Sequence, residues 1–260
     1  MSRPAPVIRS VAALAGLELR LASRRGENVL VTLVIPIAVL VFFASTGLLP
    51  GTARERVDFL LPGAIALAII ANGLVSLGIA TAYERSYGVL KRLGGAPLPR
   101  WGFVGAKVAA VLALEVVQVA ALLLVASLVL GWTPGPGWSP ILTVVAVVLG
   151  TFAFAGLGLA LAGTLRAEAM LALANGLFLA FLMLGGIVLP VADLPALVQP
   201  IAAVLPATAL AELLRIALAS GLDATLAGAA LAGAALGPAL ALLGWGAVAC
   251  VLAIRTFRWD

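Results

Sequence analysis

Few side chains in the apolar parts of this chain could do chemistry, and Glu115 is the one acidic residue well inside an apolar run. Gln118 follows it by about one helical turn, and Lys107 precedes it by two turns on a similar face. A charge in hydrocarbon costs about 2.5–3.5 kcal/mol, so such a group usually faces a cavity or a partner. We expect Glu115 and Gln118 to line a pathway or a dimer interface. The alternative is that the helix starts late and Glu115 lies near the lipid headgroups. Asn72 and Asn175, each followed by glycine, are weaker candidates for the same surface or for hydrogen bonds between helices.

Several kinds of chemistry are excluded by residue types that the chain lacks. It has no histidine, which excludes histidine-based catalytic triads, haem ligation and histidine metal sites. Cys250 is the only cysteine, so neither an intrachain disulfide nor a cysteine-rich zinc site can form. No phosphate-binding loop of the Gly-Lys-Ser/Thr type occurs. We therefore expect no enzyme activity, cofactor or metal site on this chain.

The composition is typical of an integral membrane protein. Of the 260 residues, 63% are hydrophobic and 10% are charged, whereas soluble domains carry roughly 25% charged residues. A helix needs about 20 mostly apolar residues to cross the bilayer. Six segments satisfy this requirement: Val29–Leu49, Phe59–Ala82, Phe103 or Val108 to Leu130, Ile141–Leu165, Ala169–Leu189 and Ala224–Ile254. We expect Gly237-Pro238 to kink or break the last one.

The positions of lysine and arginine predict the orientation. Six spans place both termini on one side, and 13 of the 16 basic residues fall on that side. The other side holds only Arg54, Arg56 and Arg215. Because positive residues are retained in the cytoplasm, we expect both termini to be cytoplasmic. The high proportion of basic residues is thus explained by topology, and no nucleic-acid partner is expected.

The segment before the first span, residues 1–28, has an amphipathic pattern. Its apolar residues recur at helical spacing, with arginines on the opposite side, as in helices that lie on a membrane surface. Glu18 breaks the pattern because it falls on the apolar side. The alternative is a solvated basic tail.

The connection after the second span, residues 83–101, predicts a short cytoplasmic helix over Glu84–Leu93. Gly94-Gly95 would end that helix, and Trp101 would anchor the next span at the interface. Such a stiff, short helix could receive force from another protein. The alternative, on composition alone, is a basic loop that only sets topology.

Two motifs in the chain resemble those of the type-2 ABC-transporter permeases. The first comprises an acidic residue and arginine, a Gly-x-Leu-Lys/Arg-Arg-Leu run, and a small residue before Pro-Leu and arginine. Here it reads Glu84-Arg85, Gly88-Val89-Leu90-Lys91-Arg92-Leu93 and Ala96-Pro97-Leu98-Pro99-Arg100. The second motif is similar to the segment Leu189-Pro190, Asp193-Leu194-Pro195 and Leu205-Pro206-Ala207-Thr208 through Leu214-Arg215. With the six spans and the amphipathic N-terminal segment, the resemblance covers nearly the whole chain.

The resemblance implies an all-α fold and one permease domain over residues 1–260. It implies that residues 190–223 form extracytoplasmic re-entrant helices. It also implies that a coupling helix docks on an ATP-binding-cassette ATPase subunit through Glu84, Arg85, Gly88, Leu90, Lys91, Arg92 and Leu93. ATP and Mg would be held by that partner, and a second permease, identical or related, would complete a dimer.

The predicted function is export of an amphipathic, drug-like or lipid-linked substrate through a bacterial cell membrane, as in multidrug resistance. The alternative is a proton-coupled secondary transporter that uses Glu115 as the proton carrier. That alternative predicts inverted repeats and more acids within the spans than this chain carries.

Overall fold

The computed structural model describes residues 7–24, 26–46, 48, 51–93, 99–135, 137–218 and 227–256. This part of the chain is helical and contains no strand, which confirms the all-α prediction. The helices in chain order are α1 (Val7–Arg24), α2 (Gly26–Ser45), α3 (Ala53–Ile70), the π-helix η1 (Ala71–Ser76), α4 (Leu77–Ser86), α5 (Val89–Leu93), α6 (Arg100–Val129), α7 (Pro140–Ala162), α8 (Ala167–Leu184), the 3-10 helix η2 (Val191–Asp193), α9 (Gln199–Val204), α10 (Pro206–Leu218) and α11 (Ala227–Thr256).

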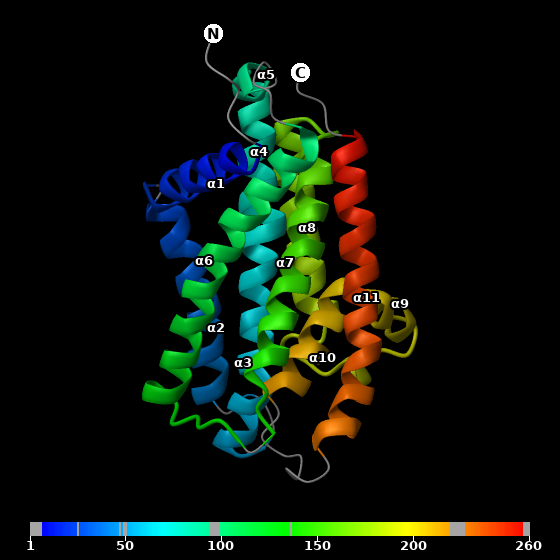
Figure 1. The fold of residues 1–260 in the computed structure, drawn as a ribbon. Coiled ribbons are helices and arrows are strands. Elements are labelled where there is room, and N and C mark those ends of the chain that lie inside the picture. The colour runs from blue at the N-terminus through cyan, green and yellow to red at the C-terminus, as the bar shows by residue number, and fades with distance from the viewer. Residues whose placement is uncertain are drawn as a thin grey trace.

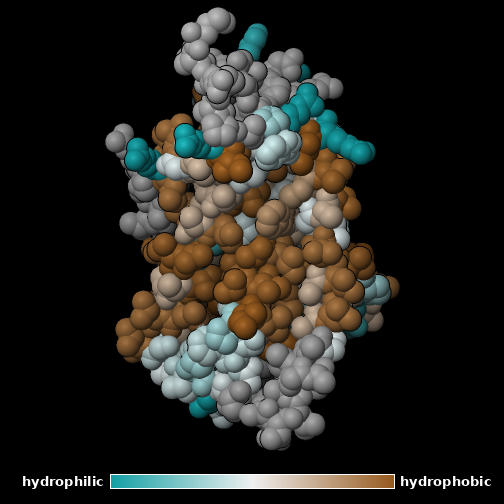
Figure 2. All heavy atoms as spheres, in the orientation of Figure 1, coloured by the Kyte–Doolittle hydropathy of each residue, from teal (hydrophilic) through white to brown (hydrophobic). Residues whose placement is uncertain are grey.

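Five helices among the described residues are long and apolar enough to cross a membrane: Ala53–Ser86, Arg100–Val129, Pro140–Ala162, Ala167–Leu184 and Gly233–Thr256. They correspond to five of the six predicted spans. The first predicted span falls on α2, whose described apolar part, Leu33–Ser45, is shorter, so a sixth span stays a prediction. A belt of apolar side chains covers the middle of the visible face, and hydrophilic side chains lie toward its two ends (Figure 2). A protein that crosses a bilayer needs this distribution, with apolar side chains against the lipid and hydrophilic side chains at the two ends that face water.

The second predicted span is the centre of the bundle and is longer than predicted. α3, η1 and α4 form one rod of 34 residues, Ala53–Ser86. At 1.5 Å per residue this is about 50 Å, well beyond the hydrocarbon thickness of about 30 Å. The rod is also the most deeply buried of the candidate spans. It therefore carries a connection from one polar end of the molecule to the other, with α5 just past its end (Figure 1).

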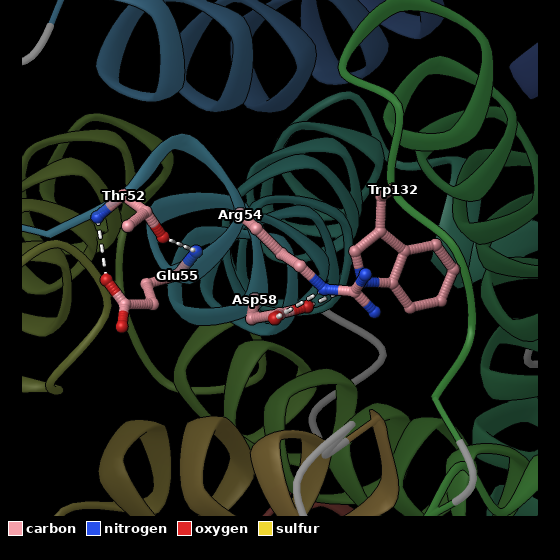
Figure 3. Close-up of polar contacts among 5 residues, drawn as sticks. All are labelled: Thr52, Arg54, Glu55, Asp58 and Trp132. Atoms are coloured by element: carbon pink, nitrogen blue, oxygen red, sulfur yellow. Dashed lines mark hydrogen bonds and ion pairs between the residues drawn. The ribbon is translucent and has the colours of Figure 1, made fainter.

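The rod begins with a capping box (Figure 3). The Thr52 hydroxyl accepts a hydrogen bond from the Glu55 N–H at 3.3 Å, and a Glu55 carboxylate oxygen accepts one from the Thr52 N–H at 2.6 Å. These bonds satisfy N–H groups that a helix start leaves open. One turn later, Asp58 accepts a hydrogen bond from the Trp132 indole at 2.9 Å and lies 3.8 Å from Arg54. The start of the rod is thus tied to the connection between α6 and α7.

Glycines bring the rod into direct backbone contact with α7. A Cβ added at Gly158 of α7 would lie 2.4 Å from the Gly73 carbonyl oxygen in η1. A Cβ added at Gly73 would lie 2.7 Å from the Ala155 nitrogen. Small residues allow such close approach between membrane helices, whose association depends on van der Waals packing.

The last predicted span is not broken at Gly237-Pro238, since α11 continues through Pro238 to Thr256. Within the apolar belt neighbouring groups can compensate for the hydrogen bond that proline removes, so a proline does not end a membrane helix as it would a soluble one.

The connection between α8 and α11 also forms helices, η2, α9 and α10. α10 packs on α3, α7 and α11, in the half of the bundle away from α5 (Figure 1). Pro195 and Pro206 separate these short helices, because proline interrupts the hydrogen bonding of a continuous helix. Residues 219–223 of the predicted re-entrant segment lie outside the described residues.

α1 lies across the bundle at the end that carries α5, whereas the long helices run along it (Figure 1). Leu14 is buried in one cluster with residues of α6, whereas Ile8 is exposed. The N-terminal segment is therefore helical from Val7, as its amphipathic pattern predicts.

Candidate functional site

The predicted helix Glu84–Leu93 is divided by a turn. α4 ends at Ser86 and α5 is Val89–Leu93. Between them Gly88 has a φ of +71°, and its N–H donates a hydrogen bond to the Arg85 carbonyl oxygen at 2.9 Å. Glycine adopts this left-handed conformation without the strain that other residues incur, so it ends the rod at this point. The turn sets α5 apart from α4 as a separate short element.

The surface of this tip is partly apolar. Tyr87 is 75% exposed, Val89 is 43% exposed and Lys91 is exposed. The side chains of Arg92 and Leu93 lie outside the described residues, although their backbone belongs to α5. An apolar and basic surface beyond the apolar belt is suited to contact with another protein.

Two of the predicted coupling residues point into the molecule. Leu90 is completely buried and belongs to one cluster with Leu14 of α1 and Phe103 of α6. The Arg85 guanidinium donates a hydrogen bond to the Leu165 carbonyl oxygen in the connection between α7 and α8. These side chains attach the tip to three other parts of the bundle and are not surface residues.

Glu84 faces inward as well, as part of a charge triad with Lys107 and Glu18. The Lys107 ammonium lies 2.8 Å from a Glu84 carboxylate oxygen and 2.8 Å from a Glu18 carboxylate oxygen. The Lys107 side chain is 0% exposed, and the two glutamate side chains are 16% and 15% exposed. The Phe103 ring centroid lies 5.3 Å from the same ammonium. One positive charge thus joins three elements: α1, α4 and α6.

Sequence spacing did not identify this triad. Spacing groups Lys107 with Glu115 on one face of α6, whereas the fold directs Lys107 toward Glu18 and Glu84. The signal that could have found it is the position of Glu18, an acid on the apolar side of an amphipathic helix. An acid there needs a buried cation, because an unpaired charge is costly to bury.

Three of the four predicted intramembrane polar residues come together in a buried polar cluster. The Asn72 amide of η1 donates a hydrogen bond to the Gln118 side chain of α6. The Thr151 hydroxyl of α7 donates one to Glu115 of α6. The four side chains are each at most 5% exposed, and the second Glu115 oxygen has no hydrogen-bond partner among the described residues. Glu115 is therefore enclosed and does not snorkel to the headgroups.

The polar cluster coincides with the π-helical turn of the rod, Ala71–Ser76, which carries Asn72. π-helical turns inside α-helices frequently occur at functional sites. Thr151 was not identified from the sequence. Its signal is weak because a threonine can bond to its own helix, as Thr151 also does through the Val147 carbonyl oxygen at 2.7 Å.

The fourth residue, Asn175 of α8, lies apart from the polar cluster. It is exposed, and its amide donates a hydrogen bond to the Leu171 carbonyl oxygen at 2.8 Å. It lines a cavity of about 690 Å³ between α2, the η1–α4 part of the rod, and α8. Glu84 and Tyr83 line the same cavity nearer to α5.

The second sequence motif is organised around Arg215 of α10. Its guanidinium lies 4.2 Å from the Phe59 ring centroid and donates a hydrogen bond to the Gly186 carbonyl oxygen. The Thr208 hydroxyl donates one to the Ala202 carbonyl oxygen of α9 at 2.6 Å. These contacts hold α9 and α10 against α3 and the end of α8.

The comparisons with known proteins gave one family. The sequence model of the family described as ABC-2 type transporter matches residues 9–219, which include every helix from α2 to α10. The comparison with curated proteins gave no match.

Proposed function

Because this chain belongs to the ABC-2 type transporter family, and is thus a transmembrane permease of that type, we propose that it forms the pathway of an ATP-driven exporter. The substrate is an amphipathic, drug-like or lipid-linked compound. ATP and Mg are bound by a separate ATP-binding-cassette subunit, since this chain has no phosphate-binding loop.

The observation that carries the proposal is the tip beyond the rod. Tyr87, Val89 and Lys91 offer an exposed surface, while Leu90 and Arg85 attach the tip to α1, α6 and the α7–α8 connection. In our proposal the exposed residues dock on the ATPase subunit, and the inward residues transmit its movement to the spans. The left-handed turn at Gly88 allows the axis of α5 to differ in direction from that of α4.

The charge distribution supports a cytoplasmic position for this tip. The basic residues of α1, of the tip, of the start of α6, of the α7–α8 connection and of the end of α11 all lie toward the α5 end: Arg9, Arg20, Arg85, Lys91, Arg100, Lys107, Arg166 and Arg255. Arg54 and Arg56 lie at the opposite end. By the positive-inside rule the α5 end, with both termini, faces the cytoplasm of a bacterial cell.

The pathway is proposed to lie between two permeases, identical or related, along the side formed by α2 and α8. α8 is largely unburied within one chain, and its exposed residues include Ala172, Asn175 and Gly176. Small residues at this spacing favour helix–helix contact in membranes. The cavity is lined by residues of α2 and α8, so a partner packed along these two helices would border it.

The proposed mechanism is alternating access. ATP binding closes the two ATPase subunits, and their approach moves the tips of both permeases. The rods then tilt or slide, and the path between the permeases opens outward. The direction comes from the difference in ATP affinity between the two states and requires no chemistry on this chain.

The test is purification of the tagged full chain from its host, with ATP hydrolysis and export measured on the complex. A double variant, Val89→Asp with Lys91→Glu, is expected to lower co-purified ATPase about tenfold or more, the equivalent of a 1.4 kcal/mol contact. Leu197→Asp, at a residue 92% exposed on the opposite half, is the matched control and should have no effect.

Two results would contradict the proposal. One is unchanged ATPase association and export in the double variant. The other is proton-driven transport by the purified chain in vesicles that hold no ATPase, a result that would support the secondary-transporter alternative.

A further inference from the structure

We propose that the cavity between α2, the rod and α8 binds lipophilic cations, and that Glu84 is the residue that selects their charge. This inference deepens the proposed function and rests on it for the consequence of binding. The binding itself is a property of this chain alone.

The cavity has the size and lining of a small-molecule site. Its volume of about 690 Å³ lies within the range of roughly 300–1,000 Å³ found for ligand sites. Its walls are mostly apolar and include Ile79 of α4 and Phe178 of α8. Ser76 and Asn175 add two polar side chains to the lining. Such a lining favours a compound with a large apolar body.

The charge on the wall is negative. Among the described residues that line the cavity, Glu84 alone is charged. Its nearest cation, Lys107, is shared with Glu18, so the triad holds two carboxylates for one ammonium. All three side chains are largely enclosed, where charge interactions are stronger than in water. Glu84 therefore gives this wall a negative charge that Lys107, shared with Glu18, offsets only in part, and this charge favours a cationic occupant over an anionic one.

Two aromatic rings stand beside the carboxylate. Tyr83 and Tyr87 both line the cavity, with ring centroids 6.0 Å apart and planes inclined by 30°. The faces of aromatic rings attract cations through their quadrupoles, at exposed sites such as Tyr87 as well as at buried ones. The aromatic pair and Glu84 lie at the same end of the cavity. This end forms a head site for the cationic group of a ligand, and the apolar remainder of the cavity forms a body site for its apolar part.

Binding of a cation has a consequence for the tip. A cation in the head site competes with Lys107 for the Glu84 carboxylate. This competition weakens the ion pair that joins α4 to α6 and, through Lys107, to α1. Glu84 lies four residues before Gly88, so the link that weakens lies about one helical turn before the turn to α5. Occupancy of the cavity is thereby communicated to the docking surface. By reciprocity, ATPase docking changes cation affinity by the same factor.

The probe is tetraphenylphosphonium, compared with tetraphenylborate, which has similar size and shape but the opposite charge. Saturable binding to the full chain in lipid nanodiscs is measured by equilibrium dialysis, with empty nanodiscs subtracted. We expect the cation to bind saturably and the anion at least about tenfold more weakly, a difference of 1.4 kcal/mol. Equal binding of the two ions, or no saturable binding of the cation, would overturn the inference.

The variant is Glu84→Gln, which keeps the side-chain shape and leaves Lys107 paired with Glu18, so it is expected to fold. It should weaken cation binding about tenfold and leave anion binding unchanged or stronger. The matched control is Glu168→Gln, an exposed carboxylate of α8 that does not line the cavity. Cation affinity that is the same in Glu84→Gln as in the parent contradicts the assignment. Because no ATPase subunit is present, this result is independent of the docking test.

Discussion

Replacement of Lys107 by methionine tests whether the charge triad holds α1, α4 and α6 together. Methionine keeps an unbranched apolar stem of similar length, so the packing beside Phe103 is largely preserved. What is lost is the ammonium that lies 2.8 Å from both Glu18 and Glu84. The two carboxylates then face each other with no cation between them.

The expected loss of unfolding free energy follows from the burial of the three side chains. Removal of one partner from a buried ion pair costs about 3–5 kcal/mol. The Lys107 side chain is 0% exposed, but the two glutamates are 16% and 15% exposed and can regain some water. We therefore expect Lys107→Met to lower the free energy of unfolding by about 2–4 kcal/mol, somewhat less than for a fully enclosed pair.

The assay is reversible unfolding of the full chain by dodecyl sulfate in mixed micelles, followed by circular dichroism. A triple variant, Lys107→Met with Glu18→Gln and Glu84→Gln, separates charge from packing, because neutral groups in place of a buried ion network are often tolerated. It should recover all but about 1 kcal/mol of the loss. A single variant as stable as the parent would refute the reasoning. A triple variant no more stable than the single one would show that packing, and not an unpaired charge, is responsible.

Two further predictions concern the packing of the rod. Gly158→Ala places a methyl group 2.4 Å from the Gly73 carbonyl oxygen, so α7 must move and the loss should be about 1–3 kcal/mol in the same assay. Gly244→Ala on α11 is its control: apart from the adjoining backbone of α11, no described atom lies within 4 Å of the new Cβ, and alanine should leave stability unchanged or raise it by up to about 1 kcal/mol. Trp132→Phe removes the indole hydrogen bond to Asp58 and should cost about 1–3 kcal/mol, because the acceptor is a carboxylate. A loss below about 0.5 kcal/mol would mean that this bond does not hold the α6–α7 connection to the rod.

The membrane fold was accessible from the sequence because hydrocarbon imposes a simple rule on composition. Every backbone polar group must be bonded within the bilayer, so apolar runs of about 20 residues become helices. Five of the six predicted spans correspond to helices that are long and apolar enough to cross a membrane. The residues at which the spanning helices end were less predictable from the sequence. The rod extends to Ser86 because its last turns pack on α7 and α8, and the pattern of apolar residues does not report that packing.

The triad illustrates what one-dimensional spacing misses. On α6, spacing places Lys107 near Glu115, because both lie on a similar face of one helix. The structure assigns them different partners: Glu18 and Glu84 for the former, Thr151 for the latter. Which side chains on other helices become partners depends on how the helices cross. The crossing is decided by contacts between residues that are far apart in the sequence, such as Gly73 and Gly158.

By itself the sequence determined that the chain is a helical membrane protein, which family it resembles, and where its basic residues concentrate. These properties follow from local composition and from a motif of consecutive residues. The tertiary structure decided which side chains of the motif face outward. Leu90 and Glu84 turn inward, whereas Tyr87 and Val89 form the surface. The reason is physical: the left-handed turn at Gly88 sets the direction of α5, and the packing of α1, α4 and α6 selects the face that is buried.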